Sequence, residues 1–185
     1  MAYIRVIDYP ESNGALKEIY DDLISTCGKL ADVHKIQSLN APTILSHMNL
    51  YKDIMFGQSP LKRYQREMLA VVVSAVNQCE YCLRHHREAL FHYWKDYQRI
   101  DLLVRQPDAV ALNEADASLC QYARDLTISP ELSGEQKIVS LRKAGFDDRA
   151  ILDSTLVISY FNFVNRMSMA LGLEIHPDEI KGYKY

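Results

Sequence analysis

Two cysteines and a histidine occur at a spacing that could support thiol chemistry. Cys79, Cys82 and His86 are separated by steps of three and four residues. On a helix these steps place all three side chains on one face, one turn above another. Cys79 is predicted at or beside the start of this helix, where unpaired backbone N–H groups and the helix dipole favour a thiolate. A thiolate is the form of cysteine that attacks peroxides and disulfides.

The histidine and the second thiol would complete a redox site. One turn beyond Cys82, His86 can take the thiol proton and then hold the thiolate as an ion pair. A thiol three residues from an oxidised sulfur can convert it to a disulfide before it is oxidised further. Two other interpretations stay open: a buried pair without chemistry, or a zinc site completed by His86 and Glu67. Structural zinc usually draws on two such cysteine pairs, and this sequence has one.

Glu67 is the fourth candidate, because it lies on the apolar stripe of a helix predicted over about 59–76. A carboxylate facing the core is costly unless it has a partner. In one continuous rod Glu67 and Cys79 would be about 18 Å apart. If the chain instead reverses at Asn77-Gln78, Glu67 comes within reach of His86, which it would orient and polarise. The alternative is a partly exposed carboxylate paired with a basic residue.

The apolar pattern predicts helices along most of the chain. Ser133 opens one of them with a capping box, and Asp147 caps the last. Residues 96–108 are ambiguous, and no segment alternates with period two, so the sequence predicts an all-α fold of about seven helices. Ser59-Pro60 and Ser129-Pro130 each precede a helix, a break and a more apolar helix, which suggests two related helical halves. The predicted helices cover about 13–27, 40–56, 59–76, 79–93, 113–125, 133–145 and 147–171.

Length and composition limit the class of protein. The 185 residues suggest one domain, and 48% apolar with 24% charged residues is typical of a globular protein. A net charge of -3 gives no basic excess for nucleic acid. The most apolar stretch, 68–76, is too short for a membrane span of about 20 residues, and the first residues carry charge too early for a signal peptide. The sequence therefore predicts a cytoplasmic protein with no nucleic-acid or membrane partner, in which Cys27 and Cys120 are core residues.

The four candidate residues carry a resemblance to a known family. Glu67, Cys79, Cys82 and His86 resemble the E-x11-C-x-x-C-x3-H signature of the alkylhydroperoxidase D (AhpD)-like family, in the carboxymuconolactone decarboxylase superfamily. The sequence segments 74–86, 145–152, 160–166 and 170–172 are similar to the longer branch of this family, which is called peroxidase-related. The resemblance covers roughly residues 40–175 of a single domain over 1–185. It implies an all-α AhpD-like fold and a homo-oligomer such as a dimer, trimer or hexamer.

The resemblance also implies a thiol peroxidase without a cofactor. Cys82 would attack the hydroperoxide, Cys79 would resolve the oxidised sulfur, and Glu67 and His86 would relay protons. The reductant would be a thiol or dithiol partner of the lipoyl-bearing or thioredoxin-like kind. Two other functions stay open. One is a lyase of the carboxymuconolactone decarboxylase type, which needs no redox thiols, and the other is a non-enzymatic helical assembly with a redox-sensing or zinc-binding C-x-x-C.

One position departs from the family pattern. Well-studied members can have a relay histidine just before the second cysteine, where this sequence has Tyr81. His85 is the substitute nearby, but a neighbouring helix position points about 100° away from that of His86. Asn162, Asn165 and Arg166 interrupt the apolar pattern of the last helix, so we expect them to hydrogen-bond across an interface or to line the site.

Overall fold

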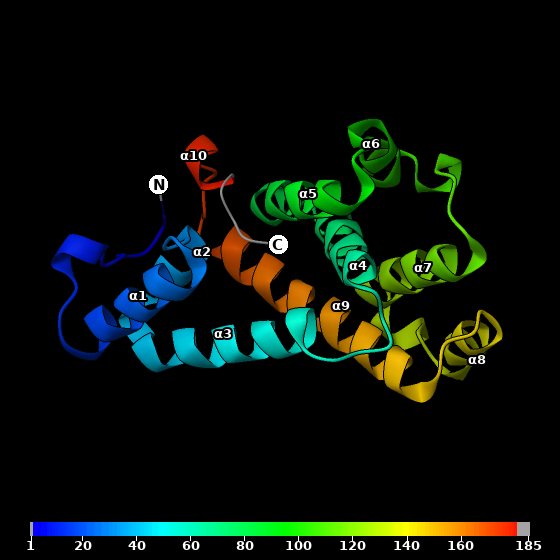
Figure 1. The fold of residues 1–185 in the computed structure, drawn as a ribbon, viewed down its shortest axis with the longest axis horizontal. Coiled ribbons are helices and arrows are strands. Elements are labelled where there is room, and N and C mark those ends of the chain that lie inside the picture. The colour runs from blue at the N-terminus through cyan, green and yellow to red at the C-terminus, as the bar shows by residue number, and fades with distance from the viewer. Residues whose placement is uncertain (1, 181–185) are drawn as a thin grey trace.

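The structure is a computed structural model that describes residues 2–180, apart from the side chains of residues 177 and 178 (Figure 1). All regular secondary structure in this range is helical, which confirms the predicted all-α fold. Eight helices have nine residues or more, close to the seven predicted. In the described part of the chain, no helix is both long and apolar enough to cross a membrane. The helices are α1 (Gly14–Cys27), α2 (Asp32–Lys35), α3 (Ala41–Phe56), α4 (Arg63–Val76), α5 (Glu80–Trp94), α6 (Tyr97–Arg105), α7 (Glu114–Ile128), α8 (Glu135–Lys143), α9 (Asp148–Ala170) and α10 (Pro177–Ile180).

Helix α4 lies at the centre of the main core. It packs against α5, α7 and α9, and every residue from 65 to 74 is buried. A helix that is buried on all sides must satisfy its polar side chains internally, which is the case for the residues discussed below. Helix α1 packs on α3 around a second, smaller cluster, and these two helices form one end of the molecule while α7 and α8 form the other (Figure 1).

The predicted start of the helix at Ser59-Pro60 is wrong, because α4 begins at Arg63. The hydroxyl oxygen of Ser59 accepts the backbone N–H of Leu61 at 3.1 Å, so this serine closes a short turn rather than capping a helix. Lys62 is the N-cap, and its backbone N–H donates to the side-chain oxygen of Gln65 at 2.9 Å. A serine–proline pair fits a turn as well as a helix start, and local sequence does not separate the two.

Local sequence predicted some of the other helix starts correctly and others wrongly. Asp147 caps α9 as predicted, since its carboxylate accepts the N–H of Ala150 at 2.7 Å. The capping box at Ser133 is wrong: Gly134 is the N-cap of α8, with no side-chain cap. The ambiguous stretch 96–108 contains α6, whose N-cap Asp96 accepts a backbone N–H. The two helices that follow Ser59-Pro60, α4 and α5, have 14 and 15 residues. The two that follow Ser129-Pro130, α8 and α9, have 9 and 23 residues.

The chain reverses between α4 and α5 at residues 77–79, which confirms the predicted break at Asn77-Gln78. Gln78 has a left-handed backbone with φ 58°, a conformation that is uncommon outside glycine. The side-chain amide of Asn77 donates to the amide oxygens of Asn162 and Asn165 on α9, each at 3.0 Å. Two of the polar residues that interrupt the last helix therefore tie it to the turn that precedes the site.

Asp116 of α7 fixes the start of α4, and its removal should destabilise the fold. It is 2% exposed, and its carboxylate accepts the hydroxyl of Tyr64 at 2.9 Å and the amide of Gln65 at 2.7 Å. Asp116→Ala leaves the buried Gln65 amide without its acceptor, so we expect the free energy of unfolding to fall by about 2 to 4 kcal/mol. Urea unfolding measures this. The exposed Asp108→Ala is the control, with a change of at most about 0.5 kcal/mol, and equal midpoints for the two variants would contradict the assignment.

Candidate functional site

The antiparallel pair α4 and α5 brings Glu67 to His86, as the sequence predicted. Oε2 of Glu67 lies 2.6 Å from Nδ1 of His86, and the Glu67 side chain is 1% exposed. An ionised carboxylate can only accept, so Nδ1 carries the proton in this contact. Nε2 is then the nitrogen of His86 that can take up and release a second proton.

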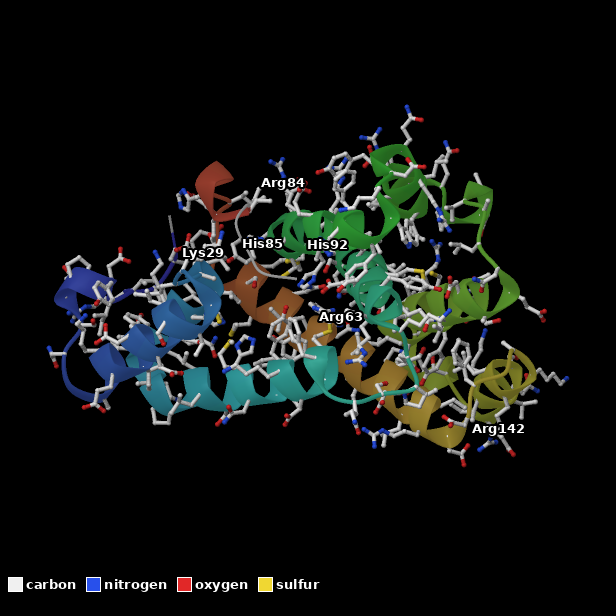
Figure 2. The ribbon with its side chains drawn as sticks, in the orientation of Figure 1. Lys29, Arg63, Arg84, His85, His92 and Arg142 are labelled. Carbon is white, nitrogen blue, oxygen red and sulfur yellow. The ribbon has the colours of Figure 1, made fainter. Side chains whose placement is uncertain are left out.

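Arg63 is a second partner of Glu67, one turn earlier on α4. Its guanidinium lies 2.6 Å from Oε1 of Glu67 and stacks on the ring of Phe56, 4.1 Å from the ring centroid. Figure 2 shows Arg63 inside the molecule, between α3 and the α4–α5 pair, whereas Arg84 and Arg142 lie at its outer edge. Burial alone would raise the pKa of Glu67, but His86 and Arg63 together hold it below its ordinary value. The carboxylate is therefore buried and ionised, not partly exposed.

Both cysteines of the C-x-x-C pair are buried free thiols. Cys79 is the N-cap of α5, as predicted, and Cys82 lies in its first turn. The hydrogen bond from the Cys82 thiol lowers the pKa of Cys79. The same hydrogen bond and burial raise the pKa of Cys82 well above its ordinary value. The reduced pair thus places its first negative charge on Cys79 and keeps the remaining proton on Cys82.

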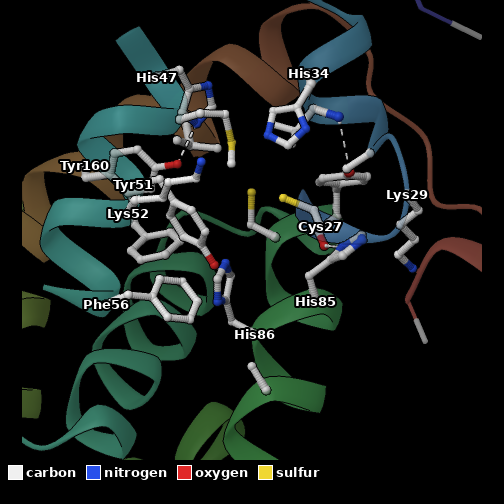
Figure 3. Close-up of a pocket in the computed structure, with 18 of the residues that line it drawn as sticks. Cys27, Lys29, His34, His47, Tyr51, Lys52, Phe56, His85, His86 and Tyr160 are labelled. Carbon is white, nitrogen blue, oxygen red and sulfur yellow. Dashed lines mark hydrogen bonds between the residues drawn. The ribbon is translucent and has the colours of Figure 1, made fainter. Parts of the chain in front are cut away.

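The two cysteines border different hollows. Cys82 and His86 line a cavity of about 320 Å³, which Figure 3 shows. Cys79 lines a second hollow of about 570 Å³, beside Gln78 and the end of α9. Tyr81, which lies between the cysteines in sequence, borders both.

The cavity behind Cys82 is mainly apolar. Helices α3, α5 and α9 and the segment around α2 enclose it, with His34 and His47 on one side and His86 on the opposite side (Figure 3). Cys27, which was predicted to be core, is half-buried at the end of α1 and borders this cavity. The apolar side chains of its walls include Val33, Met48, Phe56, Ala89, Phe161 and Val164.

Two polar residues of α9 meet Cys82. The hydroxyl of Ser168 lies 3.9 Å from the Cys82 sulfur, and hydrogen bonds from Asn165 and Ser168 partly offset the rise in the pKa of Cys82. Asn165 is fully buried and also donates to Ser74 Oγ at 3.2 Å. The sequence weighed Asn165 as a site residue but missed Ser168, whose signal was a small polar residue three positions later on an apolar helix.

Tyr81 and His85 belong to a different network from the Glu67–His86 pair. The Tyr81 hydroxyl donates to Oε1 of Glu179 on α10 and accepts the backbone N–H of Val33. His85 meets the carbonyl oxygen of Tyr81 through Nδ1, 2.8 Å away, and its Nε2 lies 3.6 Å from Glu179 Oε1. Burial would raise the pKa of Glu179, but hydrogen bonds including those from His85 and Tyr81 lower it to about 2. His85 therefore points away from the Glu67–His86 line, as its helix position predicted.

The zinc interpretation gains no support from the geometry. Within the part of the chain that the structure describes, no three His, Cys, Asp or Glu side chains are grouped so that they could hold a metal ion. Glu67 and His86 are instead engaged with each other, and Cys79 and Cys82 share a hydrogen bond.

Comparison with known proteins agrees with the resemblance seen in the sequence. Residues 42–125 match the model of the carboxymuconolactone decarboxylase family. The chain is 28% identical to an uncharacterized peroxidase-related protein from Silicibacter sp. TM1040, with TM-score 0.83 and coverage of 95% of this chain and 93% of that one. A second peroxidase-related protein, from Ralstonia eutropha JMP134 and described as an alkylhydroperoxidase AhpD core, is 19% identical, with TM-score 0.86 and coverage of 97% and 94%. The debrominase Bmp8, solved with 2,3,4-tribromopyrrole, has the same fold at 15% identity, with TM-score 0.78 and coverage of 98% and 100%.

Proposed function

We propose that the protein is a thiol-dependent hydroperoxidase, because residues 42–125 match the model of the carboxymuconolactone decarboxylase family and the chain has an AhpD-like fold. Cys79 and Cys82 would cycle between dithiol and disulfide, with Glu67 and His86 as a proton relay. One observation carries this proposal. Cys82 and His86, with the buried Glu67 carboxylate behind the imidazole, border one mainly apolar cavity.

The proposed cycle starts from a pair that has lost one proton. Nε2 of His86, which borders the same cavity as Cys82, holds that proton, and Glu67 stabilises the imidazolium. The proton that remains on Cys82 then shifts along the hydrogen bond to Cys79, which leaves a thiolate on Cys82, the sulfur that faces the cavity.

The oxidation step then balances within the site. The Cys82 sulfur attacks the terminal oxygen of the hydroperoxide, so that an S–O bond forms, the O–O bond breaks and Cys82 becomes a sulfenic acid. The alkoxide takes the Nε2 proton of His86 and leaves as an alcohol. The Cys79 thiol attacks the Cys82 sulfur, which forms the disulfide and releases water. A lipoyl-type or thioredoxin-like dithiol supplies the two electrons that restore both thiols.

Intact mass spectrometry tests the cycle. One equivalent of an organic hydroperoxide is added to reduced protein, and the remaining thiols are alkylated. We expect two of the four alkylation sites to be lost. The loss should map to Cys79 and Cys82, because these are the only two cysteines that lie three residues apart in the sequence. Four alkylated thiols would contradict the proposal, and the lactone decarboxylation of the family name would then be the activity to assay.

We also propose that the chain forms a homo-oligomer and works in a reducing compartment such as the cytoplasm. Large exposed apolar side chains on a folded chain often mark a contact surface. Four free cysteines fit a compartment that keeps thiols reduced. The large exposed apolar residues of α3 and α9 are Leu45, Leu50, Phe56, Leu152, Leu156, Phe163 and Met169.

A further inference from the structure

A chain of hydrogen bonds runs along the cavity wall opposite His86, and the proposed cycle does not use it. The side-chain amide of Gln37 donates to the carbonyl oxygen of Val33 at 2.8 Å and contacts Nδ1 of His47 at 2.7 Å. Nε2 of His47 in turn lies 2.5 Å from the hydroxyl oxygen of Tyr160. His47 and Tyr160 are 6% and 7% exposed, and both border the cavity (Figure 3).

The direction of these hydrogen bonds follows from the donors. The contact with the Val33 carbonyl identifies the Gln37 atom as the amide nitrogen, which can only donate. Nδ1 of His47 therefore accepts, and the neutral imidazole carries its proton on Nε2. That proton goes to the oxygen of Tyr160, so the Tyr160 hydroxyl must direct its own proton away from His47.

Both groups keep these protonation states near neutral pH. Burial lowers the pKa of His47 to about 4, so the ring is neutral. Burial raises the pKa of Tyr160 well above its ordinary value, and the nearby Tyr51 and Cys82 add to this rise, so the hydroxyl keeps its proton. The network thus holds a fixed O–H donor at the wall of an apolar cavity.

The rest of this wall favours an uncharged ligand. Burial, with a further contribution from His47, lowers the pKa of His34 to about 3, so this ring is neutral as well. His34 is 9% exposed, and its Nδ1 has no hydrogen-bond partner among the described residues. Three cations border the cavity: Arg63 is paired with Glu67, the Lys29 ammonium donates to the backbone carbonyl of Glu179, and Lys52 is exposed. An anion would therefore gain no counter-charge beside Tyr160 from the two histidines.

We infer that Tyr160, oriented by His47 and Gln37, is the donor that binds an acceptor oxygen on an uncharged, mainly apolar organic substrate. A ligand without an acceptor leaves this buried O–H unpaired, and such a site rejects the ligand. The inference deepens the proposed function and rests on it where it names the substrate as an organic hydroperoxide rather than hydrogen peroxide. The binding preference itself involves no thiol chemistry.

A matched pair of ligands tests the inference on reduced protein without peroxide. Acetophenone offers a carbonyl acceptor on an apolar body, and isopropylbenzene has a similar shape without one. Binding is followed through the NMR shift of the Met48 methyl group, which borders the cavity. We expect Tyr160→Phe to weaken the binding of acetophenone about tenfold and to leave the binding of isopropylbenzene unchanged or tighter. Tyr122→Phe is the control, because its buried hydroxyl meets Thr155 outside the cavity, and it should change neither ligand.

A second variant keeps the Tyr160 hydroxyl and reverses its direction. In Gln37→Glu the carboxylate accepts from Nδ1–H of His47, so Nε2 becomes an acceptor and the Tyr160 O–H turns toward it. The same selective loss of acetophenone is expected. Equal weakening of both ligands by Tyr160→Phe, or unchanged acetophenone binding in both variants, would overturn the inference. Selective binding in a protein whose thiols resist peroxide would instead contradict the proposed function alone.

Discussion

Cys82→Ser is expected to lower kcat/KM for an organic hydroperoxide by about a thousandfold or more. A serine hydroxyl does not ionise near neutral pH, so the cavity loses its nucleophile. Cys79 is unchanged in this variant, but it borders the other hollow and cannot replace Cys82 at the cavity. Peroxide consumption with excess dithiothreitol measures the loss. Cys120→Ala is the control, because Cys120 is buried in the main core with its pKa raised to about 12, and this variant should keep the wild-type rate.

Cys79→Ser should separate the roles of the two thiols. Without Cys79 the oxidised Cys82 has no resolving partner, so we expect a single oxidation followed by conversion to the sulfinic acid, visible in the intact mass. The opposite result for the two variants would reverse the roles of the two cysteines. Cys79 is the cysteine whose pKa is lowered, so an active Cys82→Ser protein together with an inactive Cys79→Ser protein would make Cys79 the nucleophile.

Glu67→Gln is expected to reduce both activity and stability, with a pH dependence that identifies the carboxylate. The variant leaves the Arg63 guanidinium without its counter-ion, which should cost about 2 to 4 kcal/mol of unfolding free energy at pH 7. It also removes the charge that stabilises protonated His86, so we expect kcat/KM to fall by about ten- to a hundredfold. Peroxide consumption at pH 7 measures the second effect.

The sign of the pH effect follows from the lowered pKa of Glu67 in the folded protein. A carboxyl group with a lower pKa in the folded than in the unfolded state stabilises the fold above its unfolded pKa, and this contribution is lost as the pH falls through the folded pKa. Wild type and Glu67→Gln should therefore differ above about pH 5 and converge in acid. Glu80→Gln, which alters an exposed ion pair with Arg84, should change stability by at most about 0.5 kcal/mol at any pH. A constant difference between wild type and Glu67→Gln at all pH values would contradict the assignment.

The sequence predicted contacts that depend on one short hairpin. The meeting of Glu67 and His86 followed from a break at Asn77-Gln78 and the rise of a helix, because an antiparallel pair with a short turn has little freedom of register. The partnership of Arg63 with Glu67 was also within reach, since the two are four residues apart on one helix.

Contacts between distant elements could not be predicted in the same way. His47 and Tyr160 are separated by 113 positions, and their contact depends on how α3 lies across α9. Apolar periodicity tells which face of a helix is buried, but not which residue of another helix it meets. Cys27 shows the same limit, because its stripe correctly indicated a buried face, while the cavity at the end of that face arises only from the packing of other helices.

The separate hollows at Cys79 and Cys82 have a consequence for the order of events in the proposed cycle. In that cycle, a reductant in the hollow beside Cys79 would approach the disulfide from outside the cavity that holds the newly formed alcohol. Product release and re-reduction then need not wait for each other, and a high concentration of hydroperoxide does not exclude the electron donor. Such a cycle would continue during a surge of oxidant, with the supply of reductant as the limit on its rate.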